Sequence, residues 1–287
     1  MNKPVIITAD SSADLPPSLR EECDIRFFPL YISLEGKFYK DCVDIFPDDI
    51  YAAYKERQVF PKTAAPSIGE YQSFFSGFTE QGCAVVHLSL SHTISSCAHV
   101  SQLAAEELED VHVVDSNSFC TGSGMVVMQA CRLRDEGYSA AEIAQRLLEL
   151  RKKVRAYFIL DTLDFIKQGG RCSALQAFGA TLLGLRPTVT VKSETGELVI
   201  GKKYRNKRPI AYEAFLRDCI ANLRGIIDTS LVFFMHTPDM PPQEYEPLNA
   251  LVRELLPEVR RLVVDTIGCT IVSHCGENCL AFVAFEK

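Results

Sequence analysis

Residues 84–114 read AVVHLSLSHTISSCAHVSQLAAEELEDVHVV, and they contain one complete strand–helix–strand unit. Residues 84–90 form an apolar run typical of a buried strand, and the Ala- and Glu-rich residues after it predict a helix. Val111–Val114 is the next predicted strand. Strands separated by a helix in this way favour a parallel sheet with helices on its faces.

The same alternation extends over the first half of the chain. Val5–Thr8 is a further apolar strand, and Ile25–Leu34 is strand-like, with a hairpin turn predicted at Glu35-Gly36-Lys37. Two capping boxes open further helices, each pairing a serine with a glutamate three residues later: Ser67 with Glu70, and Ser139 with Glu142.

The pattern changes near residue 155. After a strand at Tyr157–Leu160, a small-residue helix is predicted over Ser173–Leu183. Pro187–Val191 and Glu197–Tyr204 are two strands joined by a short turn, which requires antiparallel pairing. A helix at about 209–223 and three more strands follow. We therefore predict an α/β protein of two domains: residues 1–155 with a parallel sheet, and residues 156–287 with a largely antiparallel sheet.

Composition excludes several classes of protein. The 287 residues are 47% hydrophobic and 23% charged, values that are typical of a soluble globular protein and not of a disordered one. The formal net charge of −7 disfavours nucleic acid as a partner. No uncharged apolar run is long enough for a membrane span, and the N-terminus lacks the features of a signal peptide, so we expect a cytoplasmic protein.

The charge is unevenly distributed. Residues 151–208 contain 13 Lys and Arg against four acidic residues. This segment includes Arg171 and a basic cluster, which we define as Lys202, Lys203, Arg205, Lys207 and Arg208. We predict that the segment forms a basic patch that docks an acidic surface of a partner.

Hydroxyl side chains gather where predicted strands run into loops. In a parallel sheet, ligands bind beyond the carboxyl ends of the strands, where helix N-termini present free N–H groups. Such an edge suits a carboxylate or a phosphate, although each hydroxyl could equally be a helix cap. The loops in question are Asp10-Ser11-Ser12, Thr63–Ser67, Ser91–Ser96 and Asp115-Ser116.

Two catalytic or metal alternatives involve His274, which we place after a strand at Thr270–Ser273. Ser95 and His274 could form a nucleophile–base pair of an acyl hydrolase. His274, Cys275 and Cys279 could bind zinc, although a fourth ligand is not evident. The sequence contains no Gly-x-x-x-x-Gly-Lys-Ser/Thr phosphate-binding loop.

Six motifs in order resemble the DegV family of bacterial fatty-acid-binding proteins, the FakB-type subunits of fatty acid kinase. The similarity covers nearly the whole chain. The matching segments are Ala9–Leu15, Thr63–Ser67, Ile94–Cys97, Asp115–Gly124, Leu163–Arg171 and Ile271–Leu280.

The resemblance implies a function. A long-chain fatty acid such as palmitate, stearate or oleate is expected in an apolar tunnel between the layers. Its carboxylate would be bound by the hydroxyls of Thr63 and Ser95 and by the backbone N–H of Ser96, with His274 beside it and Arg171 near the tunnel mouth. A separate ATP-binding kinase subunit would phosphorylate the acid. The chain itself would then be no enzyme and need no cofactor or metal. The alternative to the acyl hydrolase considered above is a regulatory binder of another small anionic lipid.

The chain departs from the family pattern at several positions. Ser96 and Cys97 stand where glycine and threonine are usual, so the backbone at Ser96 must not need a positive φ. Glu277 replaces proline and adds a negative charge close to His274. Ala64, Ala65 and Cys279 replace polar residues of the pattern.

Overall fold

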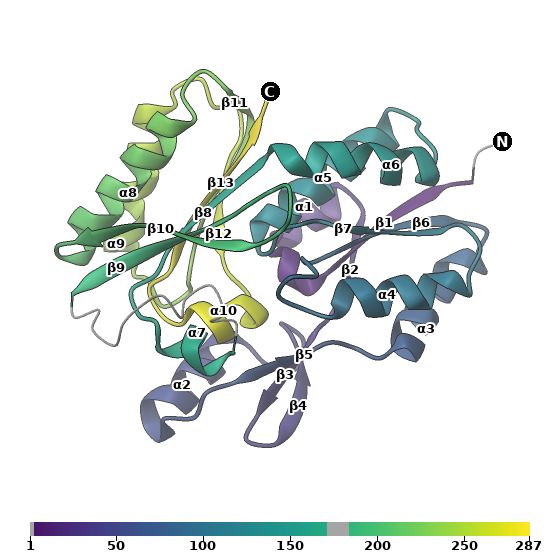
Figure 1. The fold of residues 1–287 in the computed structure, drawn as a ribbon, viewed down its shortest axis with the longest axis horizontal. Helices are drawn as coiled ribbons and strands as arrows, with labels where there is room; N and C mark the ends of the chain where they lie inside the picture. The colour runs from purple at the N-terminus through teal and green to yellow at the C-terminus, as the bar shows by residue number, and fades with distance from the viewer. Residues whose placement is uncertain (1–2, 171–183) are drawn as a thin grey trace. The chain divides into compact units, whose positions relative to one another are not determined.

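The computed structural model describes residues 3–170 and 184–287, which form two compact units (Figure 1). The first unit contains the chain up to Tyr31, Ala64–Val154 and Ser193–Glu197. The second contains Ile32–Thr63, Arg155–Lys192 and Leu198–Lys287. Each unit is described by itself below.

The two compact units differ from the predicted linear division at residue 155 in two segments. Residues 32–63 belong to the second unit, because Asp41 binds the start of helix α10 (Cys269–Cys275) and helix α2 (Pro47–Arg57) packs against that helix. The turn Ser193–Glu197 belongs to the first unit, where Thr93 Oγ1 donates a hydrogen bond to the carbonyl of Gly196 at 2.6 Å.

The first unit contains the predicted parallel sheet. Its strand order is β2-β1-β6-β7, and all three neighbouring pairs are parallel. At the centre, Ile7 of β1 pairs with Ile25 of β2 and Val86 of β6. The strands are β1 (Val5–Asp10), β2 (Ile25–Phe28), β6 (Ala84–Ser89) and β7 (Val111–Asp115).

Helices cover both faces of this sheet. Helices α3 (Ile68–Thr79) and α4 (Cys97–Glu106) pack together, as do α5 (Thr121–Asp135) and α6 (Ala140–Leu150), and the pairs lie on opposite sides of the strands (Figure 1). Both predicted capping boxes are confirmed. Short segments η1 (Ser11–Ala13), α1 (Pro17–Glu22) and η2 (Arg151–Lys153) complete the unit.

The second unit contains a six-stranded sheet of order β10-β9-β8-β13-β11-β12. The predicted hairpin of β9 and β10 is antiparallel, β8 with β9 and β11 with β13 are also antiparallel, and β11 with β12 is parallel. The strands are β8 (Val154–Ile159), β9 (Leu185–Val191), β10 (Leu198–Arg205), β11 (Ile227–His236), β12 (Leu262–Thr266) and β13 (Leu280–Glu286).

Helices α8 (Arg208–Asn222) and α9 (Pro242–Leu255) pack with this sheet in one apolar core that includes Phe215, Phe234 and Phe282. A small sheet of order β4-β3-β5 also belongs mainly to this unit. Its strands are β3 (Tyr31–Leu34), β4 (Lys37–Lys40) and β5 (Lys62–Ala64).

Three sequence-based assignments change or stay open. The predicted strand Ile25–Leu34 is two strands, β2 and β3, because Pro29 interrupts it and β3 pairs in the small sheet. The predicted strand Thr270–Ser273 is wrong, since these residues lie in helix α10. The predicted helix Ser173–Leu183 falls outside the described residues. Among the described helices, none is both long and apolar enough to cross a bilayer.

Candidate ligand-binding site

Thr63 and His274 are in contact in the second unit. Thr63 lies in β5 and His274 in the last turn of α10, and the Thr63 hydroxyl lies 2.9 Å from His274 Nε2. Both residues are partly buried. Two sequence-predicted site residues are therefore brought together across 211 positions of the chain.

Gly169 packs against the ring of His274. Gly169 ends the short helix α7 (Asp164–Gln168), and a Cβ built on it would lie 2.3 Å from His274 Nδ1. That separation is shorter than any non-bonded contact allows. The first glycine of the Gly-Gly-Arg motif is therefore needed for the observed position of the imidazole.

An aromatic cluster lies beside this pair. The ring centroids of Tyr54, Phe60 and Phe165 lie 4.8–5.2 Å from one another, and the rings pack in tilted and edge-to-face arrangements. Phe165 belongs to α7 and is 1% exposed. Gly276 adopts φ +72°, and a Cβ on it would lie 2.7 Å from the Phe165 ring, so a side chain is excluded there as well.

Glu277, the unexpected acidic residue, forms an ion pair. Its carboxylate lies 2.5 Å from Lys55 Nζ, and Lys55 belongs to α2. The Glu277 side chain is 21% exposed and that of Lys55 is 59% exposed. Hydrogen bonding to Glu277 raises the pKa of Lys55, so the ammonium stays charged. The negative charge near His274 is therefore balanced by a cation of the same unit.

Ser95 and Ser96 lie in the first unit, in the loop between β6 and α4. The Ser95 hydroxyl accepts a hydrogen bond from the N–H of Cys97 at 3.2 Å, so this side chain does cap the first turn of α4. Ser96 is exposed and has φ −81° and ψ −3°, an ordinary helical conformation. A serine is therefore accommodated where the family pattern has glycine.

Asp10 anchors the start of that same loop. Its carboxylate, 1% exposed, accepts hydrogen bonds from the Tyr71 hydroxyl at 2.6 Å, the Ser89 hydroxyl at 2.7 Å and the N–H of Leu90 at 3.1 Å. His87 Nε2 lies 3.3 Å away. Burial opposes ionisation, but His87 and the hydroxyl donors outweigh it and lower the pKa of Asp10. The motif pointed to Asp10 as part of a binding loop, whereas the structure gives it a positioning role.

The hydrolase alternative gains no support from these contacts. The Ser95 hydroxyl accepts from Cys97 N–H, and the partner of His274 Nε2 is Thr63. Burial raises the pKa of the Cys97 thiol to about 12, which keeps it protonated and poorly nucleophilic.

The zinc alternative is likewise unsupported. Within residues 3–170 and 184–287, one group of side chains has metal-ligating atoms close together, and it consists of Asp41, Cys42 and Cys269. His274, Cys275 and Cys279 do not form such a group.

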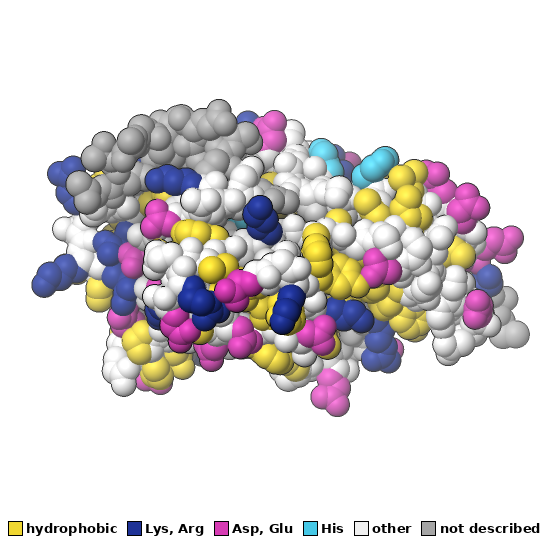
Figure 2. Space-filling model, turned by 90° about the horizontal axis from the view of Figure 1, so that it is seen from below, with side chains coloured by type: hydrophobic (Ala, Val, Ile, Leu, Met, Phe, Trp, Pro, Cys, Tyr) yellow, Lys and Arg dark blue, Asp and Glu magenta, His cyan; other side chains and the backbone are white. Residues whose placement is uncertain are grey.

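The basic cluster is partly neutralised. Lys202 pairs with Asp218 at 2.6 Å, and Arg208 pairs with Glu244 at 2.5 Å and Asp161 at 3.2 Å. Four members, Lys202, Lys203, Arg205 and Lys207, are exposed. On the face drawn in Figure 2, basic and acidic side chains also lie interspersed. Arg171 falls outside the described residues.

Comparison with known proteins decides the family. The family model described as "Uncharacterised protein, DegV family" matches residues 4–287. The chain belongs to the DegV family. A DegV domain-containing protein of Caldanaerobacter subterraneus is 30% identical over 291 residues, with both chains covered completely.

Two solved structures extend the comparison. A DegV-family protein from Thermus thermophilus, described as fatty acid binding, is 31% identical, covers 100% of both chains and superposes with a TM-score of 0.87. A stearic-acid-binding protein from Eubacterium ventriosum is 25% identical, covers 99% of this chain and 98% of its own, and has a TM-score of 0.80. The predicted α/β fold, with one parallel and one mostly antiparallel sheet, is confirmed as that of DegV proteins.

Proposed function

We propose that this DegV-family chain binds a long-chain fatty acid and presents its carboxylate to a separate ATP-dependent kinase subunit. The observation that carries the proposal is the Thr63–His274 pair, positioned by Gly169, in a chain similar over its full length to fatty-acid-binding proteins. The chain has no nucleotide-binding motif of its own, in keeping with a partner that supplies ATP.

The Thr63–His274 pair can donate a hydrogen bond to a carboxylate when His274 is in one specific tautomer. When His274 carries its proton on Nε2, the imidazole donates to Thr63 Oγ1, and the threonine proton is then free to point at the ligand. A carboxylate accepts such a bond strongly because it is charged. In this account Thr63 contacts the carboxylate, and His274 orients its hydroxyl.

Ser95 and Ser96 are proposed as further carboxylate donors. Within the described residues, the N–H of Ser96 donates to no protein acceptor, as is usual at a helix N-terminus. The Ser95 hydroxyl accepts from Cys97 N–H and donates its own proton to the Cys97 sulfur at 3.1 Å. Thiol sulfur is a weak acceptor, and in this proposal the carboxylate replaces it as the acceptor of the Ser95 proton. Asp10, through Leu90, holds the start of the loop that carries them.

The acyl chain supplies most of the binding free energy in this proposal. Each buried methylene contributes about 0.8 kcal/mol, so a 16-carbon chain gives on the order of 10 kcal/mol before the costs of association. The carboxylate donors then serve to avoid burying a bare charge. Arg171 and the exposed members of the basic cluster are proposed to contact the kinase subunit.

The proposal is tested by identifying the lipid that the chain carries. The protein is purified without added lipid, denatured and extracted, and the extract is analysed by mass spectrometry. We expect a long-chain fatty acid in near-stoichiometric amount. An extract without acyl chains, together with no binding of added palmitate or oleate, contradicts the binding proposal.

The kinase step needs a separate readout. The loaded protein, ATP and a bacterial fatty acid kinase ATP-binding subunit are mixed, and acyl phosphate is trapped with hydroxylamine. We expect trapped product with both proteins and none with either alone. Bound fatty acid without product would overturn the presentation role and leave the binding role in place.

A further inference from the structure

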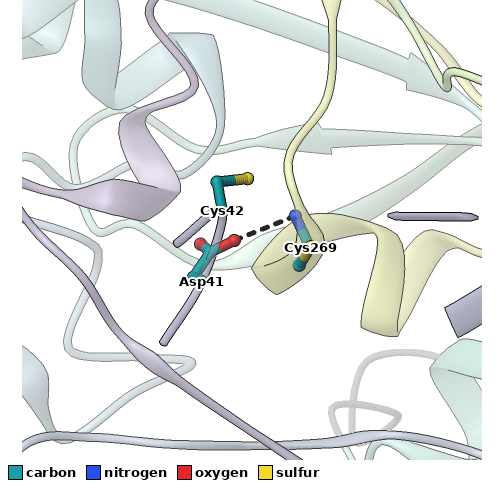
Figure 3. A group of neighbouring side chains, drawn as sticks. All are labelled: Asp41, Cys42 and Cys269. Atoms are coloured by element: carbon teal, nitrogen blue, oxygen red, sulfur yellow. Dashed lines mark hydrogen bonds between the residues drawn. The ribbon is translucent and has the colours of Figure 1, made fainter. Parts of the chain in front are cut away.

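Asp41, Cys42 and Cys269 form a side-chain cluster in the second unit that the proposed function does not use (Figure 3). One metal-ligating atom from each, the two sulfurs included, lies within 4.8 Å of the other two. Cys42 is exposed, in the turn between β4 and α2, whereas Cys269 is fully buried and opens helix α10. An accessible thiol is thus adjacent to an inaccessible one.

Asp41 connects the segment that carries Cys42 to the start of helix α10, which carries Cys269. Its Oδ1 accepts the N–H of Cys269 at 3.0 Å (Figure 3). Its Oδ2 accepts the Thr270 hydroxyl at 2.6 Å. Both carboxylate oxygens therefore already have a donor. A metal ion would have to share these oxygens with the two donors, whereas a covalent bond between the two sulfurs leaves both hydrogen bonds unchanged.

We propose that Cys42 and Cys269 are a redox-sensitive pair that forms a reversible disulfide when the protein meets a peroxide. Cys42 is the thiol that peroxide reaches, and Cys269 is the resolving thiol. The Cys269 sulfur lies close enough for bond formation by rotation of the exposed Cys42 side chain, since an S–S bond of about 2.05 Å must replace a separation below 4.8 Å.

The reaction balances with hydrogen peroxide as the oxidant. The Cys42 thiolate attacks one peroxide oxygen, an S–O bond forms and the O–O bond breaks. The departing hydroxide takes up the proton that the Cys42 thiol lost and leaves as water. The Cys269 sulfur then attacks the sulfenic sulfur of Cys42, the S–S bond forms, and the hydroxyl leaves as a second water with the Cys269 proton. Two thiols are oxidised by two electrons in total and one peroxide is reduced.

Independent features support the division of roles. The hydrogen bond with Cys42, together with burial, raises the pKa of the Cys269 thiol, which disfavours Cys269 as the thiol that peroxide oxidises first. Cys23 and Cys131 are also neighbours, in the first unit, with the Cys131 sulfur 3.9 Å from the Cys23 carbonyl. The test must therefore identify the residues that are linked and not merely count lost thiols.

The test maps disulfides in the full chain after treatment with hydrogen peroxide. Trypsin releases Cys42 in residues 41–55 and Cys269 in residues 262–287, a fragment that also contains Cys275 and Cys279. We expect these fragments to be linked, with tandem mass spectrometry locating the bond at Cys269, and to separate again on adding dithiothreitol. The link is lost in Cys42→Ser and Cys269→Ser and kept in the control Cys83→Ser.

Two results would overturn the proposal. One is oxidation of Cys42 to sulfinic acid without any link in the wild-type chain. The other is a link located at Cys275 or Cys279, which the wild-type spectrum detects even if Cys269→Ser fails to fold. Neither result bears on fatty acid binding, so the two proposals fail independently.

Discussion

The imidazole of His274 occupies the space that a side chain on Gly169 would need, since a Cβ there would lie 2.3 Å from Nδ1. Gly169→Ala must therefore displace the ring and break its contact with Thr63. We expect fatty acid affinity to fall about tenfold, the equivalent of one lost hydrogen bond to a charged group. The control is Gly77→Ala, where a Cβ meets nothing within 4 Å, and it should bind like the wild type. Equal affinity of the two variants would show that His274 needs no such space.

The ion pair of Lys55 with Glu277 predicts that the loss of affinity caused by removing Lys55 is restored when the charge of Glu277 is removed as well. Lys55→Ala leaves the Glu277 carboxylate unbalanced near the proposed carboxylate site, and we expect a severalfold loss of affinity that shrinks at high salt. Glu277→Gln alone should have little effect, and the double variant should bind like the wild type. The measurement is isothermal titration calorimetry at two salt concentrations. A loss that persists in the double variant would assign Lys55 a direct role.

The buried Asp10 carboxylate predicts acid-sensitive stability. Its pKa is lowered in the folded state from an ordinary value of 3.8, so its contribution is present above that value and is lost as the pH falls through the folded pKa. Asp10→Asn should cost roughly 3–5 kcal/mol at neutral pH, because it leaves buried donors unpaired. Its stability should also depend less on pH below about 4.

Urea unfolding at several pH values measures both effects of Asp10→Asn. The control is Asp24→Asn, at an exposed residue with φ +47° that asparagine tolerates. A variant at residue 10 with wild-type stability would mean that the carboxylate does not anchor the loop at Leu90.

The close approach of Gly196 to Ser91 can be tested with a pair of matched glycine variants. Gly196 and Gly82 have similar positive φ values of +77° and +79°, but only at Gly196 would a Cβ clash, at 2.2 Å from Ser91 Oγ. Alanine at either position costs about 1 kcal/mol of backbone strain. Gly196→Ala should lose more free energy of unfolding than Gly82→Ala, and adding Ser91→Gly should recover the difference. Equal losses would show that the contact with Ser91 adjusts freely.

Much of the fold was predictable because local signals agree with tertiary structure. The capping boxes at Ser67 and Ser139 and the apolar runs of β1, β6 and β7 correspond to elements of the parallel sheet domain. Helix α10 was not predictable, because Thr270-Ile271-Val272 is β-branched and favours a strand. Its helical start depends on Asp41, which accepts the N–H of Cys269 from 228 positions away.

The contacts within the candidate site were likewise not predictable from local sequence. Motifs identified Thr63 and His274 as individual residues, but their contact joins positions 211 apart and depends on the bare backbone of Gly169. The balance of Glu277 by Lys55 is equally non-local and could not be predicted from composition or spacing. Whether a serine fits at position 96 depends on the backbone angles there, which the sequence does not give and the structure does.

Recognition of both an acyl chain and its carboxylate can be measured with two ligands of equal chain length. Delipidated protein is titrated with stearate and with stearyl alcohol, which lacks the carboxylate. The wild-type chain should bind stearate at least about tenfold more tightly, and Thr63→Val should reduce this preference, whereas the exposed control Thr266→Val should keep it. Equal affinity of the wild-type chain for both ligands, or binding of neither, would show that the chain does not recognise a fatty acid by its carboxylate.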